Sequence, residues 1–308
     1  MKSSHFDIHD VVTQKIIKAI EEGAGDWEMP WHRPGTDFSI PKNATTDQYY
    51  RGINILSLWI DADEKKFQHQ IWATYKQWQE AGAQVRGGEK GSLIVKYGEW
   101  TPKDAKEQSN DNEADPKRVY AKPAWVFNIA QVDGVEPPTI TPKIDLTHRL
   151  DLVEKFVANT KADVRYGGQR AFYRSLGSSG TGDFIQMPDL DLFTGSPTST
   201  PTEAKYGTLL HELLHWTGAK HRLDREHGKR FGDDAYSFEE ILVEIGSATL
   251  CCTLGITSEP RPDHAQYVHH WLKILKSDNR AIFSAASQAS KAIDYLYSLQ
   301  PQTLEAAA

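Results

Sequence analysis

Cysteine is almost absent from this chain of 308 residues, since only Cys251 and Cys252 occur and they are adjacent. Neighbouring cysteines rarely satisfy disulfide geometry, so we expect no disulfide framework and a reducing, cytoplasmic setting. Long apolar runs are missing as well. No segment approaches the roughly 18 consecutive apolar residues that a membrane helix needs, and residues 1–12 lack the apolar core of a secretory signal.

An excess of positive charge is also lacking. The net charge is −7, and residues 1–134 alone carry 17 basic and 20 acidic side chains. This excludes the broad basic face that is typical of duplex-binding proteins. Any binding of nucleic acid must therefore depend on a local patch and on stacking of bases against aromatic rings. Hydrophobic residues at 39% and charged residues at 25% are typical of folded globular domains.

A proline-rich segment divides the chain. Residues 136–142 (EPPTITP) follow an Asp-Gly turn signal, and this composition is typical of a linker. A chain of this length favours about two domains. We therefore expect a first domain over 1–135, a linker over 136–145 and a second domain over 146–303.

The periodicity of apolar residues predicts an α+β fold. In the first domain it predicts helices over 9–22 and 72–81. Two β-rich runs, 92–100 and 124–132, flank a polar, acidic loop over 102–123, and this arrangement predicts a pair of strands. The second domain is expected to be mostly helical with a small sheet. Its helices are predicted over 146–159, 201–217, 238–254, 263–276 and 279–298, with a short strand around 183–188.

The sharpest motif is H-E-x-x-H at residues 211–215. On a helix, His211 and His215 lie on one face, so both imidazoles can bind one Zn²⁺ while Glu212 activates a water molecule. A helix is independently predicted, because residues 200–203 (TPTE) form a capping box with proline at the first helical position, and Gly218 provides a stop. The alternative is a pair of histidines on a partly exposed helix without a metal.

One candidate for the third metal ligand continues the same motif. His221 completes the pattern H-E-x-x-H-x-x-G-x-x-H, which is typical of metzincins. Those proteins also need a methionine turn downstream, and the three methionines of this chain all precede the motif. This argues against a metzincin. The simpler interpretation places His221 in a loop just beyond the helix.

The other candidates are acidic residues on the following predicted helix. In glutamate-type zincins such a residue binds zinc, and a carboxylate four residues on orients a histidine ligand. Glu240 as ligand with Glu244 behind it fits that plan. Ser237 and Glu240 also match a capping box, however, and if Glu240 only caps the helix, Glu244 becomes the ligand. The spacing alone leaves Glu240, Glu244 and His221 open.

These residues predict a zinc hydrolase. A bound zinc ion lowers the pKa of water towards about 7, and Glu212 is expected to accept the proton. Tyr206, His264 and Tyr267 are candidate donors to the developing oxyanion, although each also fits a packing role. By analogy with other zincins, the strand around 184–187 is expected to pair with an extended peptide substrate.

The first domain is rich in aromatic residues that alternate with basic ones. Most rings, such as Trp59 and Trp72, are expected in the core, but exposed rings can stack on unpaired bases. The glycine-rich segment 82–91 can bring backbone N–H groups close to phosphate. The residues that we expect to contact single-stranded DNA are Tyr49, Tyr50, Arg51, Lys76, Arg86 and Lys90.

Motifs in both halves of the chain carry a resemblance to a known family. In the first half they are Trp27-x-x-Pro30-Trp31, Tyr50-Arg51-Gly52-Ile53-Asn54, Trp72-x-Thr74-Tyr75-Lys76-Gln77 and Val85-Arg86-x-Gly88-Glu89-Lys90-Gly91. In the second they are Asp183-x-Ile185-x-Met187-Pro188, His211-Glu212-x-x-His215-Trp216-Thr217-Gly218, Arg222-Leu223-x-Arg225 and Glu239-Glu240. With these motifs the chain resembles the antirestriction proteins of the ArdC type over nearly its whole length.

The resemblance implies an N-terminal domain that binds single-stranded DNA and a C-terminal zincin-like metallopeptidase domain. It also implies that the protein binds plasmid DNA entering a new cell as a single strand on conjugation and protects it from restriction. In this family the position of His221 is not always histidine, which favours a glutamate as the third ligand.

Three classes of function follow. The first is a DNA-binding antirestriction protein with a working zinc peptidase that acts on an unidentified protein or peptide. The second is a DNA-binding protein whose zinc site is structural or inactive, and the third is a metallopeptidase whose first domain binds protein. The intact Glu212 favours a working site.

Overall fold

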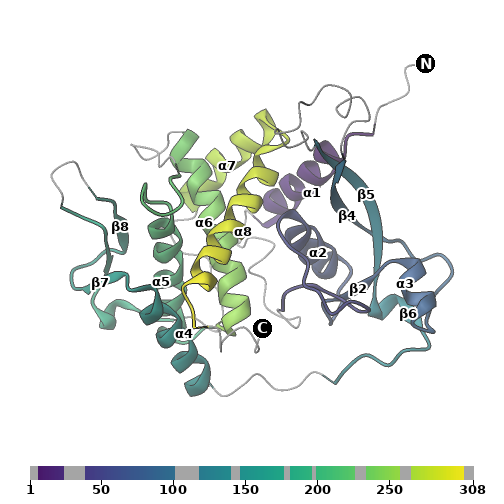
Figure 1. Cartoon of the computed structure of the whole chain (residues 1–308), viewed down its shortest axis with the longest axis horizontal. Coiled ribbons are helices and arrows are strands. Elements are labelled where there is room, and N and C mark those ends of the chain that lie inside the picture. Colours follow the sequence, from purple (N-terminus) through teal and green to yellow (C-terminus); the bar gives the residue numbers. More distant parts are fainter. Residues whose placement is uncertain are drawn as a thin grey trace, which may run out of the picture.

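The computed structural model describes residues 6–23, 39–100, 118–139, 146–176, 181–195, 199–225, 234–256 and 265–301. Figure 1 shows a mixed part of helices and strands (described residues 6–139) beside a mainly helical part with a small sheet (146–301). The expected α+β fold is confirmed. Features that lie outside the described part are Trp27, Trp31, most of the loop 102–123, linker residues 140–145, His264, the side chain of Tyr267 and residues 302–303.

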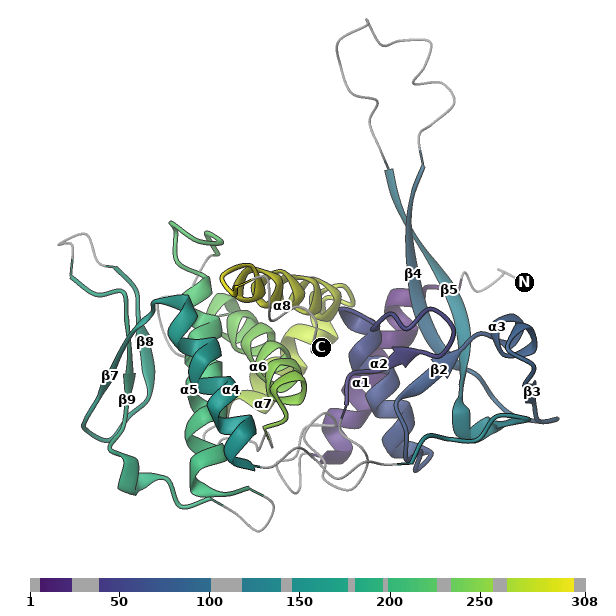
Figure 2. The same ribbon diagram turned by 60° about the horizontal axis from the view of Figure 1, so that its bottom comes forward.

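A four-stranded sheet in the order β1-β2-β5-β4 forms the framework of the mixed part. Its strands are β1 (Lys42–Asn43), β2 (Ile71–Ala73), β4 (Ser92–Trp100) and β5 (Arg118–Asn128). β1 runs parallel to β2, and the other neighbours are antiparallel. β4 and β5 pair along the whole of β4 and form the long ribbon of Figure 2, so the predicted strand pair is confirmed.

Helices α1 (Ile8–Gly23) and α2 (Ile53–Glu64) pack beside this sheet. The remaining elements of the mixed part are α3 (Tyr75–Glu80), the antiparallel pair β3 (Gln84–Val85) and β6 (Val132–Asp133), and a 3-10 turn over Ile129–Gln131. The predicted helix over 9–22 corresponds to α1.

Two features of the mixed part differ from the prediction. The helix expected over 72–81 is wrong at its start, because Trp72 lies in β2 and the helix begins at Tyr75, after the N-cap residue Thr74. The fully buried ring of Trp72 fits the sheet interior. Helix α2 was not predicted at all. Nine of its 12 residues are buried, so it shows no polar stripe at helical spacing from which a surface helix is recognised.

The helical part contains α4 (Leu146–Thr160), α5 (Pro201–Thr217), α6 (Asp234–Leu254), α7 (Ala265–Ser277) and α8 (Ala281–Ser298). These bounds agree with the predicted helices to within a few residues. Its sheet has the order β7-β9-β8, with β7 (Asp163–Tyr166), β8 (Phe172–Arg174) and β9 (Phe184–Met187), and a 3-10 turn follows at Leu190–Leu192.

The expectation that residues 184–187 pair with a substrate strand is wrong. β9 lies in the centre of its sheet, with β7 parallel on one side and β8 antiparallel on the other. A peptide can add only to a strand with a free edge, because the hydrogen-bonding groups of a central strand already have partners. Of these three strands, β7 and β8 are the ones with a free edge.

The largest apolar cluster of the described residues extends through both parts of the molecule. It includes Ile16 of α1 and Leu56 of α2 together with Leu210 of α5, Leu242 of α6 and Ala286 of α8, all fully buried. Helices α7 and α8 contact α1 and α2 directly. The two parts therefore bury apolar surface against each other. Within the described residues, no helix is both long and apolar enough to cross a membrane.

Candidate metal centre

Helix α5 places His211 and His215 on one face. Its start is defined by the predicted capping box, in which the Thr200 hydroxyl accepts a hydrogen bond from the Glu203 amide at 3.2 Å and the Glu203 carboxylate accepts one from the Thr200 amide at 3.1 Å. Pro201 takes the first helical position, where its missing N–H costs nothing. These local signals set the start and the phase of α5, and so the direction in which both imidazoles point.

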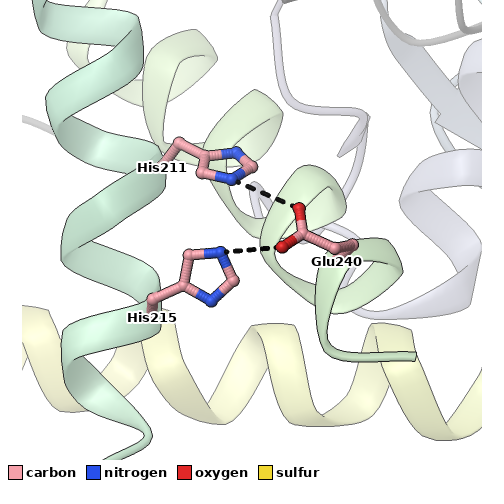
Figure 3. Close-up of side chains that lie close together, drawn as sticks. All are labelled: His211, His215 and Glu240. Carbon is pink, nitrogen blue, oxygen red and sulfur yellow. Dashed lines mark ion pairs between the residues drawn. The ribbon is translucent and has the colours of Figure 1, made fainter. Parts of the chain in front are cut away.

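Helix α6 brings a carboxylate between the two imidazoles. Figure 3 shows Glu240 facing both histidines, with its Oε1 3.3 Å from Nε2 of His215 and its Oε2 3.6 Å from Nε2 of His211. One donor atom of each residue lies within 4.8 Å of the others. His211 and Glu240 are 3% and 5% exposed. Two imidazoles and one carboxylate at this spacing could hold a metal ion, and they match the donor set that catalytic zinc sites use.

Two further carboxylates face the outer nitrogens of the same imidazoles. Oε2 of Glu244 lies 3.6 Å from Nδ1 of His211, and Oε1 of Glu239 lies 3.5 Å from Nδ1 of His215. Each histidine thus has Nε2 directed at Glu240 and Nδ1 directed at its own outer carboxylate. Metal-binding histidines typically have such a partner, which sets the tautomer and the orientation of the ring.

The part played by Glu239 was missed by the sequence reasoning. Its carboxylate is held by Arg225, whose Nε and Nη2 donate hydrogen bonds of 3.1 and 2.8 Å to its two oxygens. Arg225 also donates to the carbonyl of Leu214 and the hydroxyl of Thr217 at the end of α5. The signal was present in the adjacent glutamates and in the Arg-Leu-x-Arg motif at 222–225, but only the packing of α5 on α6 brings the two together.

The capping alternative for Glu240 is wrong. Helix α6 begins at Asp234, three residues before Ser237, so Ser237 lies inside the helix and does not cap it. Glu240 has no N-terminal amide to bind there, and its carboxylate points at the two histidines (Figure 3).

His221 lies in a different cluster. Its Nε2 is 3.2 Å from the carboxylate of Asp183 and 2.7 Å from Nη1 of Arg222, and half of its side chain is exposed. Arg222 in turn stacks on the ring of Trp216 and donates hydrogen bonds to Asp183 and Tyr173. Within the described part of the chain, the group of donors able to hold a metal consists of His211, His215 and Glu240 and does not include His221.

The cluster carries a strong negative field. Burial opposes the charged imidazolium, but the charge of Glu240 and hydrogen bonds to Glu239 and Glu240 together raise the pKa of His215 to about 10. Burial likewise disfavours the charge of Glu239, yet its bonds to His215 and Arg225 lower its pKa to about 2. Without a metal, a proton on His215 balances these carboxylates. A divalent cation would replace that proton and satisfy the same field.

Of the candidate oxyanion donors, only Tyr206 has a described side chain. Its ring is buried, and its hydroxyl donates a hydrogen bond to Glu154 of α4. The structure therefore gives Tyr206 a role in joining α4 to α5.

The residues expected to bind DNA differ in exposure and in their partners. Tyr50 is half-buried, and its hydroxyl accepts a hydrogen bond of 3.2 Å from Asn43. Arg86 lies on the glycine-rich loop, where its guanidinium donates to Glu89, Asp133 and two backbone carbonyls. Arg51 lies just before α2 and pairs with Asp294 of α8.

The other three expected DNA contacts are more open. The Tyr49 ring is 47% exposed. Lys76 is exposed on α3 and lies 3.4 Å from Glu80. Lys90 is an exposed residue of the glycine-rich loop.

Fold and site together define a zincin-like metallopeptidase domain joined to a smaller α+β domain. The family model described as a zincin-like metallopeptidase matches residues 151–288. The model for the N-terminal domain of the anti-restriction factor ArdC matches residues 6–127. The chain belongs to the ArdC family of antirestriction proteins.

Individual relatives match this chain over nearly its whole length. The chain is 43% identical to the uncharacterized protein y4eC of Sinorhizobium fredii (strain NBRC 101917 / NGR234), over 96% of this chain and 92% of that protein. It is 36% identical to the DNA primase TraC of Escherichia coli over 96% of this chain, but this match spans only 28% of the primase.

Two solved structures have the same architecture. The metal-free crystal structure of the antirestriction protein ArdC from the R388 plasmid has a TM-score of 0.76 and 37% identity, covering 96% of this chain and 98% of that one. The Mn(II)-bound structure of the same protein has a TM-score of 0.75 and 36% identity, with the same coverage.

Proposed function

We propose that this protein binds single-stranded DNA during conjugative transfer and protects it from restriction, and that it carries a metal-dependent peptidase centre at His211, His215 and Glu240. The membership of the ArdC family supports the antirestriction role. The observation that carries the peptidase proposal is the geometry of the cluster, in which both Nε2 atoms face Glu240 and each Nδ1 atom faces an outer carboxylate of its own. A chance grouping of acidic residues would not orient both rings in this way.

The donor set indicates which metal this site would hold. Imidazole nitrogen and carboxylate oxygen suit zinc, and they also accept manganese and other divalent ions of the first transition row. We propose zinc as the resident ion. The Mn(II)-bound form of the R388 ArdC protein supports a divalent site in this fold.

In the proposed mechanism Glu212 is the general base. It lies on α5 between the two histidines and is 3% exposed, which keeps its carboxylate away from bulk solvent. A bound divalent ion supplies a Lewis acid that polarises the peptide carbonyl. Glu212 takes the proton of the attacking water, while Glu239 and Glu244 keep the two imidazoles in register.

The preference for single strands follows from the charge of the chain. A net charge of −7 does not favour the many phosphate contacts that duplex binding requires. Unpaired bases offer their faces for stacking, and stacking is insensitive to sequence. We therefore propose binding with little sequence preference and with a shallow dependence on salt.

Two measurements on the purified full-length chain test these proposals. Elemental analysis should find one divalent ion per chain, and fluorescence polarisation should show tighter binding of a labelled single-stranded oligonucleotide than of the duplex. Absence of metal, together with no uptake on titration, would remove the peptidase proposal. Equal affinity for the duplex would contradict the stacking argument, and no DNA binding at all would favour a metallopeptidase whose first domain binds protein.

A further inference from the structure

A hollow of about 820 Å³ lies where the two parts of the molecule meet. Its walls come from α1, the start of α2, the β4–β5 ribbon and one face of α8, and Figure 1 shows α8 passing beside α1 and α2. We call it the α8 groove. The lining residues used below are Arg51, Gly52, Tyr97, Tyr120, Arg280 and Ser290.

The charge of the α8 groove is opposite to that of the whole chain. The net charge of the chain is −7, yet the lining contains two arginines and a histidine and no carboxylate among the described residues. Arg51 is paired at the rim with Asp294, and His9 contacts Asp7. Arg280 is exposed, and within the described residues its guanidinium makes no hydrogen bond or ion pair, while its backbone N–H donates to the carboxylate of Asp278. An anionic ligand therefore finds an available cation here.

The start of α2 adds to this positive potential. Gly52 is the N-cap of the helix, adopts φ of 57° and provides no capping side chain, and the first turn contains no acidic residue. The positive end of the helix dipole therefore faces the groove without a neutralising carboxylate of its own. A Cβ on Gly52 would lie 3.9 Å from the Ser290 hydroxyl of α8, which shows how closely the two elements approach.

Aromatic rings form the opposite wall. Tyr97 of β4 is 55% exposed and Tyr120 of β5 is 36% exposed. The ring of Tyr120 lies against Gly98 on the neighbouring strand, where any Cβ would collide with it. The glycine thus leaves room for a ring beside the ribbon. The ammonium of Lys122 lies 4.7 Å from the centroid of the Tyr120 ring, so Tyr97 offers the more open stacking surface. An exposed tyrosine near an available cation is the combination that binds single-stranded nucleic acid.

We propose that the α8 groove holds a short stretch of single-stranded DNA, with phosphates at Arg280 and the start of α2 and a base stacked on Tyr97. This proposal rests on the proposed DNA-binding function and assigns its site. It moves the contact away from the glycine-rich loop and includes α8, a helix of the metallopeptidase half. A duplex is not accommodated in this way, because its base faces are already stacked.

The glycine-rich loop is the competing site, and its charges favour it less. Its hollow of about 530 Å³ is lined by Tyr75 and Arg86, but also by Glu89 and Asp133. Both carboxylates accept hydrogen bonds from Arg86, at 3.0 and 3.4 Å. A phosphate at this position would have to replace these partners and would meet two negative charges.

Four single substitutions in the full-length chain, with Tyr97→Phe as a fifth that retains the ring, distinguish the two sites. Tyr97→Ala and Arg280→Gln change the α8 groove. Tyr75→Ala changes the glycine-rich loop. Arg170→Gln is the matched charge control, because Arg170 is also exposed and lies in the β7–β8 connection, on the far side of the molecule from β4 and β5 in Figure 1. The probe is a fluorescently labelled oligothymidylate, and its affinity is measured by polarisation over a series of salt concentrations.

The expected results differ in kind between the two groove variants. Tyr97→Ala should weaken binding about ten-fold or more with an unchanged salt slope, and Tyr97→Phe should restore it because stacking is retained. Arg280→Gln should lower the salt slope by about 1, as one phosphate contact is lost. Tyr75→Ala and Arg170→Gln should leave both affinity and slope unchanged.

Other outcomes overturn the proposal. If the wild type binds the oligothymidylate while both groove variants bind equally well, or if Tyr75→Ala is the damaging change, the DNA-binding function stands and the α8 groove is not its site. If the wild type does not bind, both proposals fail. Photo-crosslinking of an iododeoxyuridine-substituted oligonucleotide to the wild type is independent of variant folding. It should label the segment around Tyr97 or Tyr120, and labelling confined to residues 75–90 would also refute the proposal.

Discussion

Replacing Glu240 by glutamine should weaken metal binding more than any other single carboxamide substitution in the cluster. The change keeps the size of the side chain and removes one negative charge between two imidazoles that lie 3.3 and 3.6 Å from its oxygens. Outer partners of metal ligands typically contribute about 10–100-fold to metal affinity. Glu239→Gln and Glu244→Gln should fall in that range, because they act through the histidines. Glu240→Gln removes a direct donor, so its loss should exceed about 100-fold.

The assay is calorimetric titration of the metal-stripped full-length chain with Zn²⁺ and, separately, with Mn²⁺. His221→Ala is the control, because His221 contacts Asp183 and Arg222 and lies outside the donor group. Its affinity should equal that of the wild type. Far-ultraviolet circular dichroism confirms that each variant is folded. If His221→Ala weakens binding as much as Glu240→Gln, the metzincin pattern is correct and our reading of the cluster is refuted.

Three further changes test other parts of the argument. Glu212→Ala should keep the metal stoichiometry and the fold but abolish cleavage of any substrate that the wild type cuts; loss of the metal would show that the residue is a ligand and not a base. Asp183→Asn should make the free energy of unfolding depend less on pH in the acid range. Hydrogen bonds from Arg222 lower the pKa of Asp183 in the folded protein from its ordinary value of 3.8. The stabilisation by the Asp183 carboxylate is therefore present above that value and is lost as the pH falls through the lower, folded-state pKa. Chemical unfolding at several acid pH values measures this, and parallel wild-type and variant curves would contradict it. Gly246→Val should lower the free energy of unfolding by about 1–3 kcal/mol, since a Cβ at Gly246 already lies 2.8 Å from Leu214 of α5; an unchanged urea midpoint would show that the interface is looser than described.

Local signals explain which elements were predicted well. Helix α5 was expected over 201–217 and begins and ends there, because a capping box, a proline at the first position and a glycine at the end are all encoded within the segment itself. The ribbon β4–β5 was expected from two β-rich runs on either side of a polar loop, and it forms. Helix α2 was missed because it is buried almost all round, between α1, β4 and α8, and a helix of that kind carries no amphipathic pattern.

The relative placement of the two histidines of the candidate site is also determined by the local sequence. The spacing of His211 and His215 on a helix with defined phase determines that they share a face, whatever packs against it. The same spacing could not choose among Glu240, Glu244 and His221, since all three lie at a distance along the chain that permits contact.

The choice among Glu240, Glu244 and His221 depends on how α6 packs against α5. The sequence by itself determined the helix, the motif, the family resemblance and the absence of a broad basic face. Only the tertiary structure decided that Glu240 points between the imidazoles, that Glu239 and Glu244 stand behind them, and that His221 is held by Asp183. It also decided that an arginine of one half and tyrosines of the other line a single groove. The physical reason is that capping and periodicity act within a few residues, whereas the direction of a side chain toward a distant partner depends on the crossing of two packed elements.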